Sequence, residues 1–252
     1  MDSGTVTHAR ALWSELAGVR VEFSSPGAVV IAPGSRLCPP GWAGIVRIGD
    51  AAVVTAPDAR CARALNEAVR KLTYAELTDA ELTDPVRLGE ALSGTAAPVL
   101  DALGPAALAY LDRGDRDAFV PALPKEAGVS VERAAAHDDS ALAALLAGVG
   151  KGDAGESGLD EITSPAFLIR EYEDVVAAAG YVTWPRSVAH VSVLVAPDRR
   201  GRRLARIVAS AAVSHALDAG LLPQWRARPE PSRRVARALG FRELGAQLSV
   251  RM

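Results

Sequence analysis

Hydrophobic and polar positions in the C-terminal half follow a regular order of strand and helix patterns. Apolar runs with strand periodicity predict strands over 166–170, 174–183 and 188–196. A 3.6-residue period then predicts a long amphipathic helix over 201–219, and Gly220 is a suitable C-cap for it. The remaining pattern predicts a strand over 222–227, a helix over 231–239 and a final strand over 241–251.

The N-terminal half has a less regular pattern. Its clearest unit is a strand, a Pro57-Asp58 turn and a helix, together spanning Ala51–Leu72. Helical spacing also predicts helices over 86–93 and 97–103. The polar stretch Asp112–Asp117 is followed by prolines and a glycine, so it is the best candidate linker. We predict an N-terminal α/β domain over residues 1–124 and a second domain over 125–252.

Composition indicates a globular protein. The chain has 252 residues, of which 49% are hydrophobic and 23% are charged, enough to bury a substantial core. The pattern predicts no export signal and no membrane span. The two cysteines, Cys38 and Cys61, are too few for a disulfide framework, and no metal-ligand spacing is present. We therefore expect a cytoplasmic protein without a metal ion.

Charge is distributed unevenly along the chain. Residues 198–252 hold twelve arginines against four acidic residues, whereas the whole chain has a formal charge of −2. Such a basic end suits a phosphorylated small ligand or a nucleic acid. No aromatic residues alternate with these arginines to stack on bases, so we expect no nucleic-acid partner.

The segment Val193–Ala205 carries the most chemistry. A buried strand ends in the Pro197-Asp198 turn, and a loop containing Gly201 leads into the long helix, whose first N–H groups lack intrahelical partners. Those groups and the positive end of the helix dipole favour an anion such as a pyrophosphate. The same loop supplies three arginines that add positive charge: Arg200, Arg202 and Arg203.

These residues resemble the acetyl-CoA loop of the GNAT (GCN5-related N-acetyltransferase) superfamily. That loop has Arg or Gln, two residues, Gly, one residue, then Gly or Ala, between a strand and a helix. Arg200 and Ala205 match its ends, whereas Arg203 replaces its glycine and Gly201 lies nearby. Downstream, the segment ending in Leu239-Gly240-Phe241 is similar to the family's late helix.

The resemblance implies a fold and a cofactor site. The implied fold is α+β (α/β layered), a mostly antiparallel mixed sheet flanked by helices, with the N-terminal α/β domain added. The strand before the loop would bind the pantetheine arm and the thioester carbonyl of acetyl-CoA through its backbone. The implied cofactor-binding residues are Val193, Leu194, Val195, Arg200, Gly201, Arg202, Arg203, Leu204, Ala205 and Ser232.

Candidate acid–base residues come from two segments. Strand alternation puts His190 and Ser192 on one face, and a histidine can relay a proton near neutral pH. Glu156 and Glu161 lie in a Gly-containing segment, near the acceptor site that the resemblance implies. Two alternatives stay open: His190 as a hydrogen-bonded strand histidine, and the glutamates as a solvated loop. The position where the family often has a tyrosine acid is Ala236.

We therefore predict an acetyl-CoA-dependent N-acyltransferase of bacterial type. It would acetylate a primary amine of a small molecule or peptide by direct transfer. The alternative is a CoA-binding or sensor protein that has lost turnover, indicated by Arg203 and Ala236. The N-terminal half is either a degenerate second GNAT-like half or an added dimerisation domain, so a homodimer is one expectation. The similarity of 54–60 to 194–200 is either a trace of such a repeat or chance, because Pro-Asp is a common pair at the start of a helix.

Overall fold

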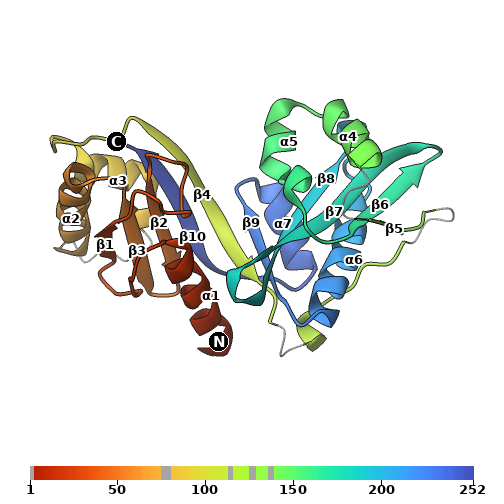
Figure 1. Cartoon of the computed structure of the whole chain (residues 1–252), viewed down its shortest axis with the longest axis horizontal. Helices are drawn as coiled ribbons and strands as arrows, with labels where there is room; N and C mark the ends of the chain where they lie inside the picture. Colours follow the sequence, from red (N-terminus) through yellow and green to blue (C-terminus); the bar gives the residue numbers. More distant parts are fainter. Residues whose placement is uncertain (1–2, 75–80, 113–115, 125–128, 136–138) are drawn as a thin grey trace. The chain divides into compact units, whose positions relative to one another are not determined.

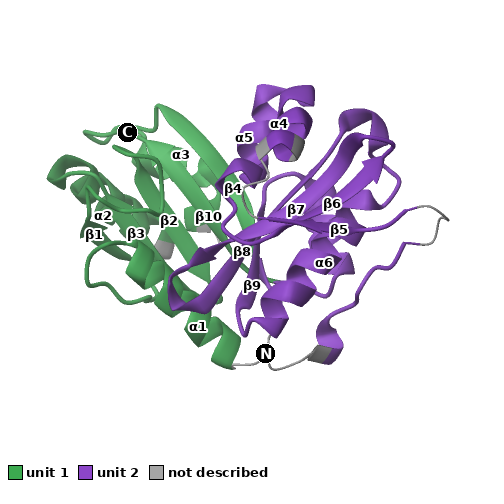
Figure 2. Ribbon diagram, turned by 45° about the vertical axis from the view of Figure 1, so that its right-hand side comes forward, with its two compact units in different colours: residues 1–108, 243–252 green, residues 109–242 purple. Residues whose placement is uncertain are grey.

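The protein consists of two compact units (Figure 2). The computed structural model describes residues 3–74, 81–112, 116–124, 129–135 and 139–252. The first unit comprises residues 1–108 and 243–252, and the second comprises residues 109–242. Each unit pairs strands into a mostly antiparallel sheet and packs helices on it, which confirms the predicted α+β fold class.

The first unit has strands in the order β1-β3-β2-β10-β4 (Figure 1). β2 and β3 form an antiparallel hairpin, β10 pairs antiparallel with β2, and β1 pairs in parallel with β3. Its elements are α1 (Ser3–Leu16), β1 (Ala28–Ile31), β2 (Ala43–Ile48), β3 (Ala51–Ala56), α2 (Ala59–Tyr74), α3 (Pro85–Leu92), β10 (Arg242–Arg251) and most of β4 (Asp101–Tyr110).

The core of the first unit lies between this sheet and α2 with α3. Strand alternation turns Ile45 and Val54 to that side, where they pack against Leu65 and Leu88 of the helices. The predicted strand–turn–helix over 51–72 is present as β3 and α2. The final strand, predicted over 241–251, is present as β10, and it contributes Leu248 to the same cluster in the first unit.

The helix predicted over 97–103 is wrong. Residues from Asp101 onward form β4, and the N–H of Leu100 donates to the carbonyl of Arg251. Pro98 lacks an N–H and disfavours helical backbone at Ala97. The hydrogen-bonding partner comes from the far end of the sequence, so local periodicity gives no sign of it.

The second unit has strands in the order β9-β8-β7-β6-β5. The pairs from β5 to β8 are antiparallel, and β8 pairs in parallel with β9. Its helices and strands are β5 (Glu132–Ala134), α4 (Asp139–Gly148), α5 (Lys151–Ser157), β6 (Ala166–Glu171), β7 (Asp174–Trp184), β8 (Val188–Val195), α6 (Leu204–Asp218), β9 (Leu222–Ala227) and α7 (Glu230–Ala238).

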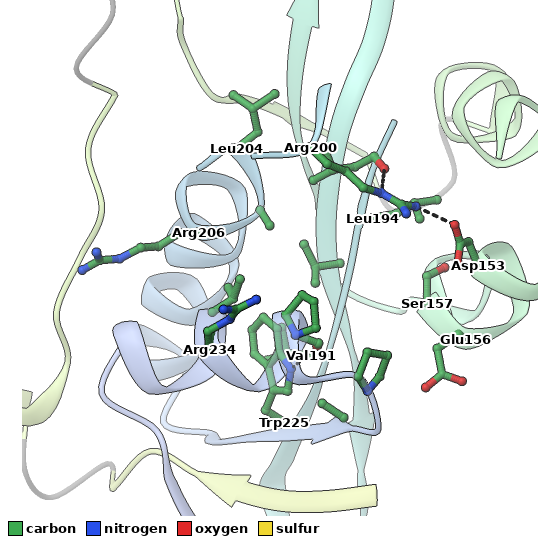
Figure 3. A pocket seen from close by; sticks show the side chains of 18 of the residues that line it. Asp153, Glu156, Ser157, Val191, Leu194, Arg200, Leu204, Arg206, Trp225 and Arg234 are labelled. Atoms are coloured by element: carbon green, nitrogen blue, oxygen red, sulfur yellow. Dashed lines mark hydrogen bonds and ion pairs between the residues drawn. The ribbon is translucent and has the colours of Figure 1, made fainter. Parts of the chain in front are cut away.

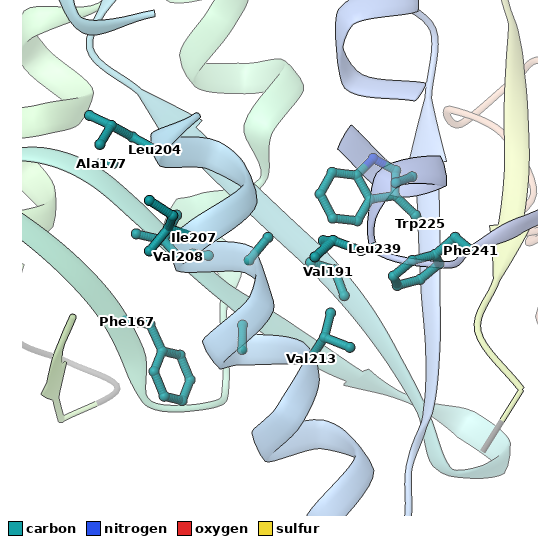
Figure 4. Packing of buried hydrophobic residues seen from close by; sticks show 14 of the residues in the cluster. Phe167, Ala177, Val191, Leu204, Ile207, Val208, Val213, Trp225, Leu239 and Phe241 are labelled. Atoms are coloured by element: carbon teal, nitrogen blue, oxygen red, sulfur yellow. The ribbon is translucent and has the colours of Figure 1, made fainter. Parts of the chain in front are cut away.

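Helices cover both faces of this second sheet. The apolar stripe of α6 packs Ile207 and Val208 against Val191 of β8, in a cluster that also holds α7 and the edge-to-face pair Trp225 and Phe241 (Figure 4). Leu194 points to the opposite face, toward α4. Alternate residues of β8 therefore face different helices, so the strand is covered on both sides.

No helix in the part of the chain that the structure describes has the length and apolar character needed to cross a bilayer.

Candidate functional site

β8 separates from β9 partway along its length. All eight residues of β8 pair with β7, but only Val188, Ala189 and His190 pair with β9, opposite Leu222, Pro223 and Gln224. Beyond His190 the two strands diverge. Because alternate backbone groups of a strand point to its two neighbours, the divergence turns backbone groups of Val191–Val195 toward the gap instead of toward β9.

A cavity of about 730 Å³ opens where these strands separate. One wall is the far half of β8, another is Trp225–Ala227 of β9, and α7 and α5 contribute side chains (Figure 3). The loop between β8 and α6 closes one end. Both the volume and the mixture of apolar walls with a few charged groups are typical of small-molecule sites.

The loop between β8 and α6 presents an uncapped helix N-terminus. A short turn, Pro197–Arg199, is followed by Gly201 at φ 83° and by Arg203 at φ 66°. Arg203 is the N-cap of α6, and its side chain caps no N–H group there. A Cβ on Gly201 would meet no atom within 4 Å, so space is not what favours glycine at this position. The left-handed backbone conformation favours it instead.

Acidic side chains hold the arginines of this loop. Glu171 of β6 binds Arg199 at 2.7 Å and Arg202 at 2.5 Å, and hydrogen bonds from these guanidinium groups lower the pKa of Glu171. Arg200 reaches across to Asp153 of α5, with 2.5 Å between Nη2 and Oδ2 (Figure 3). The loop is thus fixed on one side by Glu171 and joined to α5 on the other.

Nine of the ten predicted cofactor residues line the cavity. The tenth, Arg202, lines a neighbouring cavity beside the start of α6. Ser232 accepts a hydrogen bond from the Trp225 indole N–H at 3.0 Å, so it also fixes the aromatic wall. The nine are Val193, Leu194, Val195, Arg200, Gly201, Arg203, Leu204, Ala205 and Ser232.

His190 lies at the last paired position before the strands diverge. Its Nδ1 is 2.5 Å from Oε1 of Gln224, and its ring stacks on Trp184, with 4.1 Å between ring centroids and 14° between ring planes. Burial lowers the pKa of His190 to about 3, and the nearby Arg226 cation acts in the same direction. The imidazole is therefore neutral throughout the physiological pH range.

The other three acid–base candidates occupy different settings. Ser192 is buried and its hydroxyl donates to the carbonyl of Gly158 at 3.1 Å, so it joins β8 to the segment after α5. Glu156 lines the cavity and accepts from Nε of Arg228 at 2.9 Å. Glu161 is exposed, and its charge acts on Arg226. Of the four candidates only Glu156 lines the cavity, whereas His190, Ser192 and Glu161 do not.

Several lining residues were not predicted from the sequence. Asp153 and Ser157 come from α5, Trp225 and Arg226 from β9, and Arg234 from α7. Gln224 does not line the cavity, and its contact with His190 was not predicted either, because it depends on pairing between residues 34 positions apart in the sequence. Ala236 lies on the buried face of α7, in the core, and offers no acid. Within the described ranges no three His, Cys, Asp or Glu side chains gather as a metal site would require.

Three of the solved structures similar to this chain are described as acetyltransferases or as a GNAT protein. A GNAT-family protein from Novosphingobium aromaticivorans is 19% identical over 62% of this chain and 69% of its own, with a TM-score of 0.46. A tandem GNAT protein from the clavulanic acid biosynthesis pathway is 17% identical over 98% and 95%, with a TM-score of 0.46. The Salmonella typhimurium protein yncA, solved with acetyl-CoA, is 18% identical over 48% and 92%, with a TM-score of 0.36.

Four further solved structures are matched over only 52% to 61% of their own lengths. A search of curated proteins found no match. The GNAT acetyltransferase family model matches residues 165–246. That segment contains β6 to β9, α6, α7 and the loop that closes the cavity. The GNAT acetyltransferase family model thus matches the segment that contains both sequence motifs, which confirms the resemblance found in the sequence.

Proposed function

We propose that the protein is an N-acetyltransferase that moves an acetyl group from acetyl-CoA directly to a primary amine. The observation that carries this proposal is the separation of β8 from β9 beside an arginine-rich, uncapped helix N-terminus. The gap offers backbone groups to an extended chain and a thioester, while the loop offers N–H groups and cations to phosphates.

The residues present suit acetyl-CoA as a ligand. The side chains of Arg203, Arg206 and Arg234 line the cavity along with Arg200, so a polyanion would meet several cations. Val191, Val193 and Trp225 supply apolar walls next to the diverging strands. We assign the phosphates to the loop and the start of α6, and the thioester to the gap between β8 and β9.

In the proposed reaction the lone pair of a neutral amine attacks the carbonyl carbon of the thioester. A C–N bond forms, the C–S bond breaks, and the sulfur leaves with the electron pair. The amine loses one proton to solvent, and the thiolate takes up one to become free CoA. Backbone N–H groups of β8 that face the gap would stabilise the oxyanion.

His190 is better suited to hydrogen bonding than to storing a proton. A general base works best with a pKa near the operating pH, and the pKa of His190 is about 3. We therefore assign His190 the role of a neutral acceptor for an amine N–H, and we assign proton removal to water. Glu156 remains a candidate for binding a cationic acceptor, in competition with Arg228.

One experiment tests binding and turnover in sequence. Titration calorimetry with acetyl-CoA, CoA and 3′-dephospho-CoA should show binding that weakens without the 3′-phosphate. Release of free thiol from acetyl-CoA should then follow addition of an amine, in a panel of polyamines, aminoglycosides, amino acids and peptides. No binding of acetyl-CoA would overturn the proposal.

A second candidate function is a CoA-binding sensor without turnover. Two observations favour it: Ala236 is buried where a tyrosine acid would stand, and His190 is too weak a base to remove a proton. Binding of acetyl-CoA with no thiol release for any amine class in the panel would favour the sensor.

A further inference from the structure

Gln224 of β9 occupies a special position in the second unit. It is the last β9 residue in register with β8, directly opposite His190, and the two strands separate immediately after this pair. The Gln224 side chain is completely buried. A buried amide placed where a sheet opens is costly unless its hydrogen bonds serve a purpose.

The Gln224 amide is only half satisfied. Its Oε1 lies 2.5 Å from Nδ1 of His190, whereas its Nε2 has no hydrogen-bond partner within the described residues. An amide oxygen can only accept, so Nδ1 of His190 must carry the proton. Nε2 of His190 then keeps its lone pair and is an acceptor.

Trp184 restricts the His190 ring, and two charged residues affect its protonation. Trp184 of β7 stacks on one face and limits rotation of the ring. Arg226, two residues after Gln224 on β9, places a positive charge nearby that opposes protonation. Glu161 acts on Arg226 and moderates that charge. The hydrogen bond to Gln224 acts in the opposite direction and raises the pKa of His190, but burial and the Arg226 charge outweigh it.

We propose that Gln224 is a positioning residue: it fixes His190 in the Nδ1–H tautomer, so that Nε2 faces the reaction as the acceptor that orients the incoming amine. This rests on the proposed acetyl transfer. The amine then approaches from the face of β8 that bears His190 and Ser192, opposite the face covered by α6.

The first test measures the tautomer itself, independently of activity. Ring ¹⁵N chemical shifts of His190 in the whole protein should show protonated Nδ1 and unprotonated Nε2. Gln224→Met keeps the size of the side chain without the amide and should give a mixture of tautomers. Gln247→Met is the matched control, because Gln247 is also a buried glutamine that bonds a backbone carbonyl, at 2.5 Å from Leu37. It should leave the His190 shifts unchanged.

The second test measures the reaction. Gln224→Met should lower kcat by about 10-fold, the worth of one oriented hydrogen bond, without raising KM for acetyl-CoA. Gln224→Glu places a carboxylate at Nδ1, which raises the pKa of His190, so a new acidic limb should enter the pH profile of kcat. A purely structural role for Gln224 would produce no such limb.

Two results would overturn the proposal: a parent protein with protonated Nε2, or a Gln224→Met variant with the parent's tautomer and kcat. Failure of the proposed function is distinguishable, because it would appear as absence of acetyl-CoA binding while the tautomer measurement remains valid.

Discussion

The two units build the same local arrangement from similar sequence but finish it differently. In the first unit the hairpin β2–β3 leads through Pro57-Asp58 into α2, and in the second the hairpin β7–β8 leads through Pro197-Asp198 into α6. Each hairpin also gives its second strand a parallel neighbour, β1 or β9. That the first unit is a degenerate second GNAT-like half stays a prediction.

The difference lies in where the parallel neighbour pairs. β1 pairs with Val53–Ala56, the end of β3, so the two strands stay paired up to the turn that leads into α2. β9 pairs with Val188–His190, the start of β8, and leaves the end of β8 open. The two units therefore differ in where the parallel neighbour pairs along the strand: pairing at its end leaves no gap, and pairing at its start leaves a cavity.

The helix N-termini differ in the same sense. α2 begins at Ala59, and the Asp58 carboxylate accepts the N–H of Cys61 at 2.8 Å. α6 begins only at Leu204, after the inserted residues 199–203, and its N-cap side chain bonds no helix N–H. The first unit thus supplies a carboxylate to the N-terminus of its helix, whereas the N-cap side chain of α6 supplies no acceptor there.

The largest expected effect comes from placing an acidic residue in the second unit's loop. Gly201→Glu should weaken acetyl-CoA binding by roughly 100-fold, because it adds a negative charge and a side chain at φ 83°. Gly220→Glu is the matched control, since Gly220 has φ 72° at the other end of α6 and similar open space. Calorimetry that finds equal weakening in both variants would remove the loop from the site.

Next in size is a dependence of stability on pH that belongs to the second unit. Unfolded His190 takes up a proton below about pH 6.5, but folded His190 has a pKa of about 3. Its contribution to stability is therefore present above pH 6.5 and lost as the pH falls from 6.5 toward 3. The loss is on the order of 1 kcal/mol per pH unit. Thermal unfolding at several pH values should show a shallower acid decline for His190→Gln, and an unchanged slope would contradict the assignment.

A smaller effect tests the cap in the first unit. Asp58→Ala removes the acceptor for the Cys61 N–H and should lower Tm by about 2–4 °C. Asp198→Ala changes the corresponding Pro-Asp pair of the second unit, where Asp198 contacts Arg199 instead of a helix N–H, and should leave Tm nearly unchanged. Removing the Asp58 carboxylate should not create an acetyl-CoA site in the first unit, because β1 still pairs with the end of β3. Acetyl-CoA affinity should therefore not rise in Asp58→Ala.

The smallest effect concerns competition for Arg200. Asp153 neutralises this arginine across the cavity mouth, so Asp153→Asn should strengthen acetyl-CoA binding by about 2- to 5-fold. Glu132→Gln breaks the Arg170–Glu132 pair outside the cavity lining and serves as the control. Equal affinity in the parent and in Asp153→Asn would show that the ion pair does not compete with the ligand.

Sequence patterns predicted the parts of the molecule that depend on local order. The periods of β6, β7, β8 and α6 are visible because each buries a face against a neighbouring layer. Gly201 indicated the loop in the sequence, and its φ of 83° favours a residue without Cβ. Nine of the ten predicted cofactor-binding residues lie within Val193–Ala205, so a single motif brought them together.

Contacts between distant segments could not be predicted in this way. Asp153 meets Arg200 across 47 residues, and Gln224 meets His190 across 34. The low pKa of His190 follows from its burial beside Trp184 and Gln224 of the neighbouring strands, which a sequence pattern does not reveal. The helix predicted over 97–103 failed for the same reason, since β10 supplies the partner that makes those residues a strand.

The position of β10 has a consequence for synthesis of the chain. β10 lies between β2 and β4 in the first unit, yet it follows all of the second unit in the sequence. The ribosome therefore synthesises residues 109–242 as one continuous segment before it makes the strand that lies between β2 and β4. We expect the sheet of the first unit to keep unpaired edges at β2 and β4 until residues 242–251 have emerged, so that its completion follows synthesis of the whole second unit.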